Sequence, residues 1–186
     1  LDLEGNKLDN VDMPINKAGY NIHSAIHEAR SNDLHCVMHT HEPISQTMCS
    51  INEKFIPMVQ EACQLYERIG YHDFEGIVLD SSEKKRLISA MGTKNHTLVL
   101  KNHGLLTAGP SAIWAFVRHQ IYIRNSDIQL RALASGAEIS KIPEDVIKHT
   151  RQQFEGGSAQ GGAVVRHPEW PAFWRLLDKL DPDWKT

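Results

Sequence analysis

Strand-like and helix-like segments alternate along most of this chain, and the alternation predicts a layered α/β domain in which helices cover a sheet. Two observations support this fold class. Short apolar runs typical of buried strands are separated by segments whose apolar residues recur at helical spacing. The chain has 186 residues and shows no internal repeat, and one domain of that length buries roughly 70% of its unfolded surface. Residues 1–186 are therefore expected to form a single domain.

The elements are expected in a definite order. From the N-terminus they are a strand with a hairpin turn over residues 1–8, a helix over 21–30, a buried strand over 34–40, a short helix after Pro43, a strand over 76–80, a helix over 82–91, a buried strand over 96–104 that resumes over 105–109, and a helix over 111–135. Residues 59–76 fit both a helix and a loop. The Gly-rich stretch 155–162 is expected to be a loop before a C-terminal tail, residues 163–186.

Turn and capping residues set the ends of these predicted elements. Asp80 and Glu83 resemble a capping box at the start of the helix over 82–91, and Gly92 follows that helix as a stop signal. Ser111 can cap the long helix, which Gly136 ends. The chain opens on LDLEGNKL without a methionine, in what reads as a strand already under way, so an N-terminal part is expected to be missing.

Composition excludes several classes of partner. The formal net charge of −3 gives no general attraction for nucleic acid or for an anionic membrane. No run of ~18 apolar residues in the sequence could span a bilayer. The three cysteines form no CxxC pair and are typical of reduced thiols inside the cell. We expect a cytoplasmic protein with neither a nucleic-acid partner nor a membrane partner.

Two histidines one residue apart stand at the end of a predicted strand, in the sequence VMHTHEP. Side chains at positions i and i+2 of a strand share a face, so His39 and His41 can point into one cavity. By itself this pair does not distinguish a metal site from ordinary polar residues, because the chain contains 11 histidines. Histidines outside this context, including His72, His96 and His119, are expected on the surface or in loops.

His103 is the candidate for a third ligand. It lies in KNHGLL at the end of a second predicted buried strand, and Gly104 allows a close backbone approach or a positive φ beside it. A catalytic zinc ion takes three protein ligands and keeps one position open. Imidazole suits zinc among the common divalent ions. His39, His41 and His103 are therefore a candidate site for Zn²⁺ or another divalent metal, and ordinary hydrogen-bonded histidines are the alternative.

Several motifs together resemble one known family. HSAIHEAR, VMHTHEP, the proline of FIPM, YHDFEGI and LVLKNHGLLTAG follow one another as in the class II aldolase/adducin family, and the resemblance covers about residues 1–135. The tail WPAFWRLLDKLDP looks like that of its bacterial adducin-like branch. The resemblance implies a three-layer α/β/α fold with a central mixed or antiparallel sheet. It places the family's three metal ligands on His39, His41 and His103, and it implies a cyclic homotetramer.

The chain departs from the family pattern where the aldolases hold their substrate. Those enzymes carry a Ser-Ser-Glu stretch before the first helix, in which the serines hold the substrate phosphate and the glutamate acts as a base beside the metal. Here that place reads NKAGYN, with Gly19 or Tyr20 at the glutamate position. A tyrosine acid of the fuculose-phosphate branch would fall near Gln60 or Glu61, where no tyrosine stands.

These observations leave two functions open. The first is a zinc-dependent carbon–carbon lyase (an aldehyde-lyase) or an epimerase, acting on a small hydroxy-carbonyl compound through an enediolate. Its proton-transfer group is sought at Glu61, placed by resemblance, and in the YHDFE loop, which contains Tyr71, His72 and Asp73; Glu61 and Tyr71 are the preferred catalytic residues. The alternative is a non-catalytic module like the adducin head, which serves oligomerisation or binding.

Overall fold

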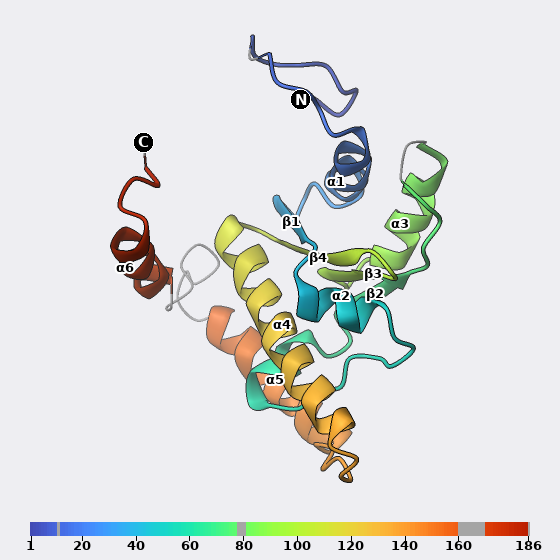
Figure 1. Ribbon diagram of the computed structural model, residues 1–186, viewed down its shortest axis with the longest axis vertical. Coiled ribbons are helices and arrows are strands. Elements are labelled where there is room, and N and C mark those ends of the chain that lie inside the picture. Colours follow the sequence, from blue (N-terminus) through green and yellow to red (C-terminus); the bar gives the residue numbers. More distant parts are fainter. Residues whose placement is uncertain (11, 78–80, 160–169, 186) are drawn as a thin grey trace.

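The computed structural model describes residues 1–10, 12–77, 81–159 and 170–185 (Figure 1). Its helices and strands are, in chain order, α1 (Lys17–Ala29), β1 (Cys36–Thr40), α2 (Pro43–Cys49), the 3-10 helix η1 (Gln60–Leu65), β2 (Ile69–His72), the 3-10 helix η2 (Ser81–Glu83), α3 (Lys84–Met91), β3 (Thr97–Leu100), β4 (Gly104–Gly109), α4 (Ala112–Ala134), α5 (Glu144–Ala159) and α6 (Trp170–Leu180).

The four strands form one mixed sheet in the order β1-β4-β3-β2. β4 pairs antiparallel with both β1 and β3, whereas β2 and β3 are parallel and are joined by a crossover through α3. A turn of three residues joins β3 to β4, and Thr40 at the end of β1 lies opposite Leu105 near the start of β4. The end of β1 and the β3–β4 turn therefore meet at one edge of the sheet.

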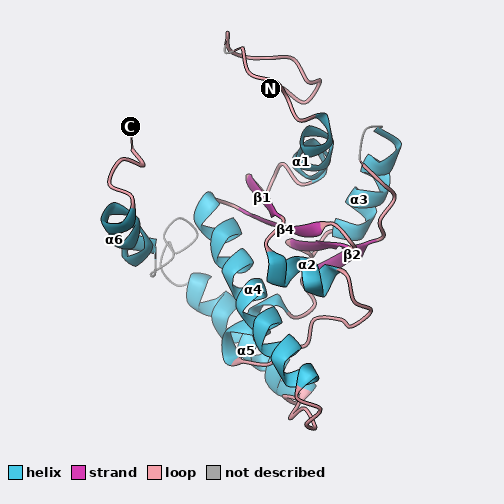
Figure 2. Cartoon of the chain, in the orientation of Figure 1, coloured by secondary structure: helices cyan, strands magenta, loops and turns pink. Residues whose placement is uncertain are grey.

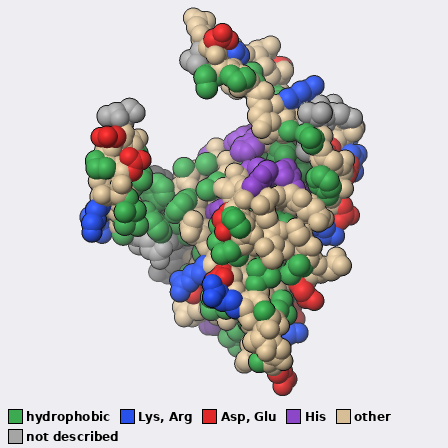
Figure 3. Space-filling model, viewed as in Figure 1, with side chains coloured by type: hydrophobic (Ala, Val, Ile, Leu, Met, Phe, Trp, Pro, Cys, Tyr) green, Lys and Arg blue, Asp and Glu red, His purple; other side chains and the backbone are tan. Residues whose placement is uncertain are grey.

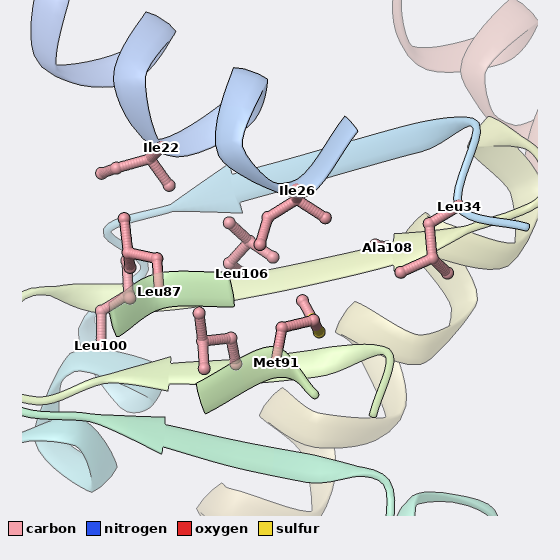
Figure 4. Close-up of a cluster of buried hydrophobic side chains, with 9 residues drawn as sticks. Ile22, Ile26, Leu34, Leu87, Met91, Leu100, Leu106 and Ala108 are labelled. Atoms are coloured by element: carbon pink, nitrogen blue, oxygen red, sulfur yellow. The ribbon is translucent and has the colours of Figure 1, made fainter. Parts of the chain in front are cut away.

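Helices cover both faces of this sheet (Figure 2). One face packs against α1 and α3 through a cluster that includes Ile22, Ile26, Leu87 and Met91 (Figure 4). The other face packs against α2 and α4. Neighbouring residues of β3 and β4 belong to opposite clusters, because successive side chains of a strand alternate between its faces. The predicted three-layer α/β/α fold with a mixed sheet is confirmed.

Two further helices, α5 and α6, follow α4 in the chain. α5 packs against η1 and buries Ile147. α6 meets the N-terminal part of α4, where Phe116 contacts the rings of Trp170 and Phe173 at centroid distances of 5.8 and 5.2 Å. The loop predicted over 155–162 is wrong for residues 155–159, which continue α5, and its remaining residues lie outside the described part of the chain. No helix among the described residues has the length and apolar character needed to cross a membrane.

The N-terminal hairpin is a second expectation that the structure corrects. Residues 1–8 contain a turn but no strand, and the Asp2 carboxylate accepts hydrogen bonds from the backbone amides of Glu4 and Asn6. The first helix begins at Lys17, four residues before the predicted start, because the Asn16 side chain caps it by accepting from Gly19 N at 3.1 Å. Most of NKAGYN is thus the first turn of α1.

Four further expectations are revised in the middle of the chain. The ambiguous stretch 59–76 contains η1 and then β2. Of the strand predicted over 76–80, the first two residues form a bend and the other three, including Asp80, lie outside the described residues. Glu83 precedes α3 without making a capping hydrogen bond, and Ser111 stands at the N-cap of α4 but its hydroxyl makes no cap bond. The predicted stop at Gly92 is confirmed by its φ of +57°.

Candidate metal centre

The three histidines predicted from sequence lie together at one edge of the sheet. His39 belongs to β1, His41 follows it, and His103 lies in the β3–β4 turn. Each pair of imidazole rings has a centroid separation of 4.8 Å. One ligand nitrogen from each ring lies within 4.8 Å of the other two. Antiparallel pairing of β1 with β4 therefore joins residues that are far apart in the sequence into one possible metal site.

Gly104 makes this close packing possible. A Cβ atom at this position would lie 2.5 Å from the Thr40 carbonyl oxygen, 2.9 Å from His41 Cδ2 and 3.0 Å from His39 Cε1. Real Cβ atoms essentially never approach backbone oxygen this closely, so any larger residue would displace the strand end. The predicted close backbone approach is thus present, whereas the positive φ of the turn belongs to Asn102, at +55°.

Hydrogen bonds fix the turn and the first ligand. Gln46 of α2 donates to the carbonyl of His103 at 3.0 Å. Nδ1 of His39 lies 3.0 Å from the Leu105 carbonyl oxygen, which can only accept, so Nδ1 carries the hydrogen and Nε2 keeps its lone pair. Nε2 of His39 and Nε2 of His41 are 3.0 Å apart. Two tetrahedral zinc ligands at about 2.0–2.1 Å from the ion are separated by about 3.3 Å, so this pair has nearly the required spacing.

The environment favours the neutral form of two of the three imidazoles, which is the form that binds a metal. Burial, followed by the repulsion of His103, lowers the pKa of His39 to about 4. Burial and then His41 lower the pKa of His103. His41 is the exposed member of the triplet, and Figure 3 shows histidine side chains gathered on the surface of this face. The cluster is thus preformed on the protein side and open on the solvent side.

A buried hydrogen-bonded network supports the strand that carries these ligands. The Thr107 hydroxyl donates to Ala115 O at 2.8 Å, so it accepts from Nδ1 of His119 at 3.1 Å. Nε2 of the same imidazole then accepts from the Thr40 hydroxyl at 2.7 Å. Burial lowers the pKa of His119 to about 4, in agreement with a neutral ring. The expectation that His119 is a surface residue is wrong.

Beside His103 lies a very small open cleft. It contains a buried pair, in which His72 Nε2 lies 2.8 Å from a Glu83 carboxylate oxygen; Glu75 lies 4.0 Å from the same nitrogen. His72 is only 7% exposed, so its expected surface position is also wrong. Sequence reasoning missed Glu83 as a site residue because its partner is a strand residue, and such a contact across elements has no local signal.

The two preferred catalytic residues lie in other surroundings. Glu61 is exposed on η1, and its carboxylate is 3.9 Å from Arg124. Tyr71 belongs to β2, packs on the side of the sheet that faces α4, and accepts a hydrogen bond from the backbone amide of Phe55 at 3.1 Å. Burial raises its pKa. Among the contacts of the described residues, neither side chain touches the three histidines, and their catalytic roles stay predictions.

The fold and this site define a class: a three-layer α/β protein with a three-histidine cluster at one sheet edge. Residues 1–130 match the family model described as the Class II Aldolase and Adducin N-terminal domain. The chain therefore belongs to the class II aldolase and adducin family, as its motifs indicated.

Known proteins from both the aldolase and the adducin branches of the family resemble this chain. A Pseudomonas aeruginosa protein named "Putative aldolase class 2 protein" is 34% identical over 185 residues, which cover 100% of this chain and 71% of that protein. Rat alpha-adducin is 32% identical over 190 residues, covering 97% of this chain but only 26% of the adducin. The crystal structure of an aldolase II superfamily protein from Pseudomonas syringae superposes with a TM-score of 0.86 at 34% identity, covering 100% of this chain and 73% of that one.

Proposed function

We propose that this protein is a metal-dependent, aldolase-like lyase or epimerase that acts on a small hydroxy-carbonyl compound. His39, His41 and His103 would hold the metal, and zinc is the ion that three neutral imidazoles with an open position suit best. One observation carries the proposal: three imidazoles converge around Gly104, burial lowers the pKa of His39 and of His103, and the cluster is open to solvent at His41. When bound, a divalent cation there would polarise a substrate carbonyl and make the adjacent carbon more acidic.

A proton must also be moved, and the cleft beside His103 contains groups suited to that step. The Glu83 carboxylate accepts from Nε2–H of His72, which leaves the lone pair of Nδ1 free to take a proton. The carboxylate also orients the ring, as a third residue orients the base in the nucleophile–base pairs of other enzymes. His72 is therefore our first candidate for the base, with Glu83 as its positioning residue. Glu61 and Tyr71 remain the predicted alternatives.

The second candidate function is a non-catalytic module for binding or oligomerisation. The similarity to rat alpha-adducin over 97% of this chain supports it. So does the replacement of the Ser-Ser-Glu stretch, because its residues here have structural roles. Asn16 caps α1, and the hydroxyl of Tyr20 donates to the Leu3 carbonyl at 2.6 Å. In this reading any bound metal would stabilise the fold without catalysing a reaction.

Compartment and assembly are proposed with the first function. The thiols of Cys36, Cys49 and Cys63 are free, which agrees with a reducing cytoplasm. A homotetramer is inferred from the resemblance to the catalytic members of the family.

Metal content and proton exchange in the same samples distinguish the two functions. Zinc-loaded wild type should hold one ion per chain, as should a variant at the exposed His149, His149→Ala, whereas His103→Ala should hold almost none. With dihydroxyacetone in D₂O, wild type should exchange the hydrogens beside the carbonyl, and chelation should stop the exchange. His72→Gln should keep the metal and lose roughly 100-fold in exchange rate, within the usual contribution of an acid–base group.

Each outcome has a defined meaning. Equal metal content in wild type and His103→Ala would refute the site. Bound metal without exchange on any small hydroxy-carbonyl compound, together with a lower melting temperature after chelation, would support the adducin-like module. If His72→Gln exchanges at the wild-type rate, the base lies elsewhere, and Glu61→Gln and Tyr71→Phe test the two alternatives in the same assay.

A further inference from the structure

A larger open cavity lies at the opposite edge of the sheet from the histidines. Arg68 precedes β2, His96 precedes β3 and Pro110 follows β4, so the cavity opens where those strands have their far ends. The metal centre lies at the edge where β1 and β3 end. Helices α4 and α5 form the walls. Its charged lining residues are Arg68, Arg118, Arg151 and Glu155, and its ring-bearing lining residues include His96, Trp114 and Phe154.

The guanidinium groups in this cavity do not all have counter-ions. Arg68 pairs with Glu155 at 2.8 Å, and Arg151 pairs with Glu67 at 2.7 Å. Arg118 differs, because its one hydrogen bond in the described structure is to a neutral acceptor, the carbonyl of Ala108 at 2.6 Å. No carboxylate of the described residues comes within ion-pair distance of Arg118.

An inward-facing cation without a counter-ion is costly, so such groups in proteins are usually paired. Burial lowers the pKa of Arg118 to about 10. Burial is the main reason that the pKa of His96 lies well below its usual range, and the positive charges of Arg118 and Arg68 lower it further. The His96 ring therefore adds no further positive charge to the cavity. Arg151 also lines the cavity, and its Nε lies 3.7 Å from Glu155. The cavity is therefore electropositive and contains donors that an oxyanion could accept from.

The walls of the cavity indicate what else the ligand carries. Trp114 lies beside the Arg118 guanidinium, which is 5.5 Å from the ring centroid. Leu65, Pro110 and Phe154 add apolar surface. Inorganic anions gain nothing from such walls, whereas an apolar or aromatic group would be removed from water and could stack on the indole.

We propose that this cavity is a second ligand site, which binds a small organic carboxylate with an apolar or aromatic body. The carboxylate pairs with Arg118, whose planar guanidinium can donate two parallel hydrogen bonds to it. The body of the ligand lies against Trp114 and Phe154. This site is independent of the metal centre and of the reaction proposed there.

Benzoate is a suitable probe, and inorganic phosphate tests whether the apolar body matters. We expect benzoate to shift the Trp114 indole N–H resonance of the zinc-loaded full chain in a saturable manner, with Trp114→Phe identifying the signal. His103→Ala should bind benzoate as wild type does, which separates this site from a carboxylate bound at the metal. Phosphate should bind at least 10-fold more weakly.

The matched variants are Arg118→Lys and Arg124→Lys, two arginines of the same helix. Arg118→Lys keeps the charge but loses the planar fork, so benzoate affinity should fall at least 10-fold; Arg124→Lys, at an exposed position, should bind as wild type does. Melting curves without ligand check that both variants fold. The proposal is overturned if wild type shows no saturable shift, if His103→Ala abolishes the shift, or if phosphate binds as tightly as benzoate.

Discussion

His119 shows how a single residue supports the candidate metal centre without touching it. Its imidazole connects Thr40, which lies between two of the candidate metal ligands, to Thr107 of β4. Both ring nitrogens are used, one as donor and one as acceptor, so only the neutral ring fits. Protonation would place a second hydrogen on Nε2, opposite a hydroxyl that already donates to it. The network should therefore be sensitive to acid.

This sensitivity predicts a pH-dependent stability. The pKa of His119 is about 4 in the folded protein and about 6.5 when unfolded, so the unfolded state binds more protons below pH 6.5. The contribution of neutral His119 to the free energy of unfolding is complete above pH 6.5 and is lost as the pH falls towards 4. Between about pH 7.5 and 4, the free energy of unfolding should fall on the order of 3 kcal/mol more in wild type than in His119→Gln.

Urea unfolding across this pH range measures the effect. His149→Gln, at an exposed position on α5, is the control and should follow wild type. Other titrating groups act on all three proteins, so only the difference between them matters. Parallel pH profiles for wild type and His119→Gln would contradict the prediction.

Gly104 gives a second prediction at this scale. In Gly104→Ala the added methyl group would collide with the Thr40 carbonyl and with two ligand rings, so the imidazoles must separate. Zinc affinity should fall about 10- to 100-fold, as when groups that orient metal ligands are lost. Gly156→Ala is the matched control, since a Cβ there meets no atom within 4 Å. Competition with a chromogenic chelator gives the zinc affinities of both variants. Equal affinities would mean that the end of β1 can shift to make room for the methyl group.

Among the elements, α4 has an unusual role, because its buried face is largely polar. Asn125 accepts from Met58 N and donates to Ile56 O, both at 2.8 Å. Gln129 accepts from Ile56 N at 2.9 Å and donates to Lys54 O at 2.8 Å. Two side-chain amides thus bind the backbone of the irregular segment 54–58 much as a neighbouring strand would.

Loss of one amide should therefore destabilise the protein. Gln129→Leu leaves the amide of Ile56 and the carbonyl of Lys54 without these partners, which should cost about 1–3 kcal/mol per unsatisfied buried group. Gln120→Leu, on the exposed face of the same helix, should change stability by less than about 0.5 kcal/mol. Chemical unfolding of both variants provides the comparison. A stability of Gln129→Leu equal to that of Gln120→Leu would show that water replaces the amide fully.

The strands that were predicted correctly are those whose own residues show a clear apolar pattern. β1, β3 and β4 are apolar runs, and the three histidines stand at the ends of such runs. β2 was missed because Gly70 interrupts its pattern, and that glycine is required by a distant contact: a Cβ there would lie 2.0 Å from Ala90 O. α5 was not predicted, and a loop was expected over its last residues because glycine disfavours a helix by about 1 kcal/mol. The buried pair of His72 and Glu83 forms only when β2 and α3 pack together.

At the scale of the whole molecule, α6 stands out as an amphipathic helix with little cover. None of its residues is buried, and Trp174, Leu176, Leu177 and Leu180 are between 37% and 71% exposed. In Figure 1 the helix extends from the body beside the start of α4. An apolar surface of this kind is typical of an interaction site, and a second copy of the chain is the partner that the homotetramer prediction requires.

Light scattering after size exclusion tests the assembly. Wild type should have a mass four times the 21.0 kDa of one chain. Leu177→Glu should reduce that mass, because a charge would enter the apolar contact, whereas Leu133→Glu should not; both leucines are 37% exposed, and only the first is on α6. A wild-type monomer at micromolar concentration would refute the tetramer.

The pairing of β1 with β4 also has a consequence for how the protein is made. His103 comes 62 positions after His41 (103 − 41), so at a translation rate of roughly 5–20 residues per second the third imidazole is synthesised about 3 to 12 s after the second. Until then the growing polypeptide contains only two of the three candidate ligands. An ion bound by all three candidate ligands would therefore have to be acquired after the β3–β4 turn, which contains His103, has been synthesised.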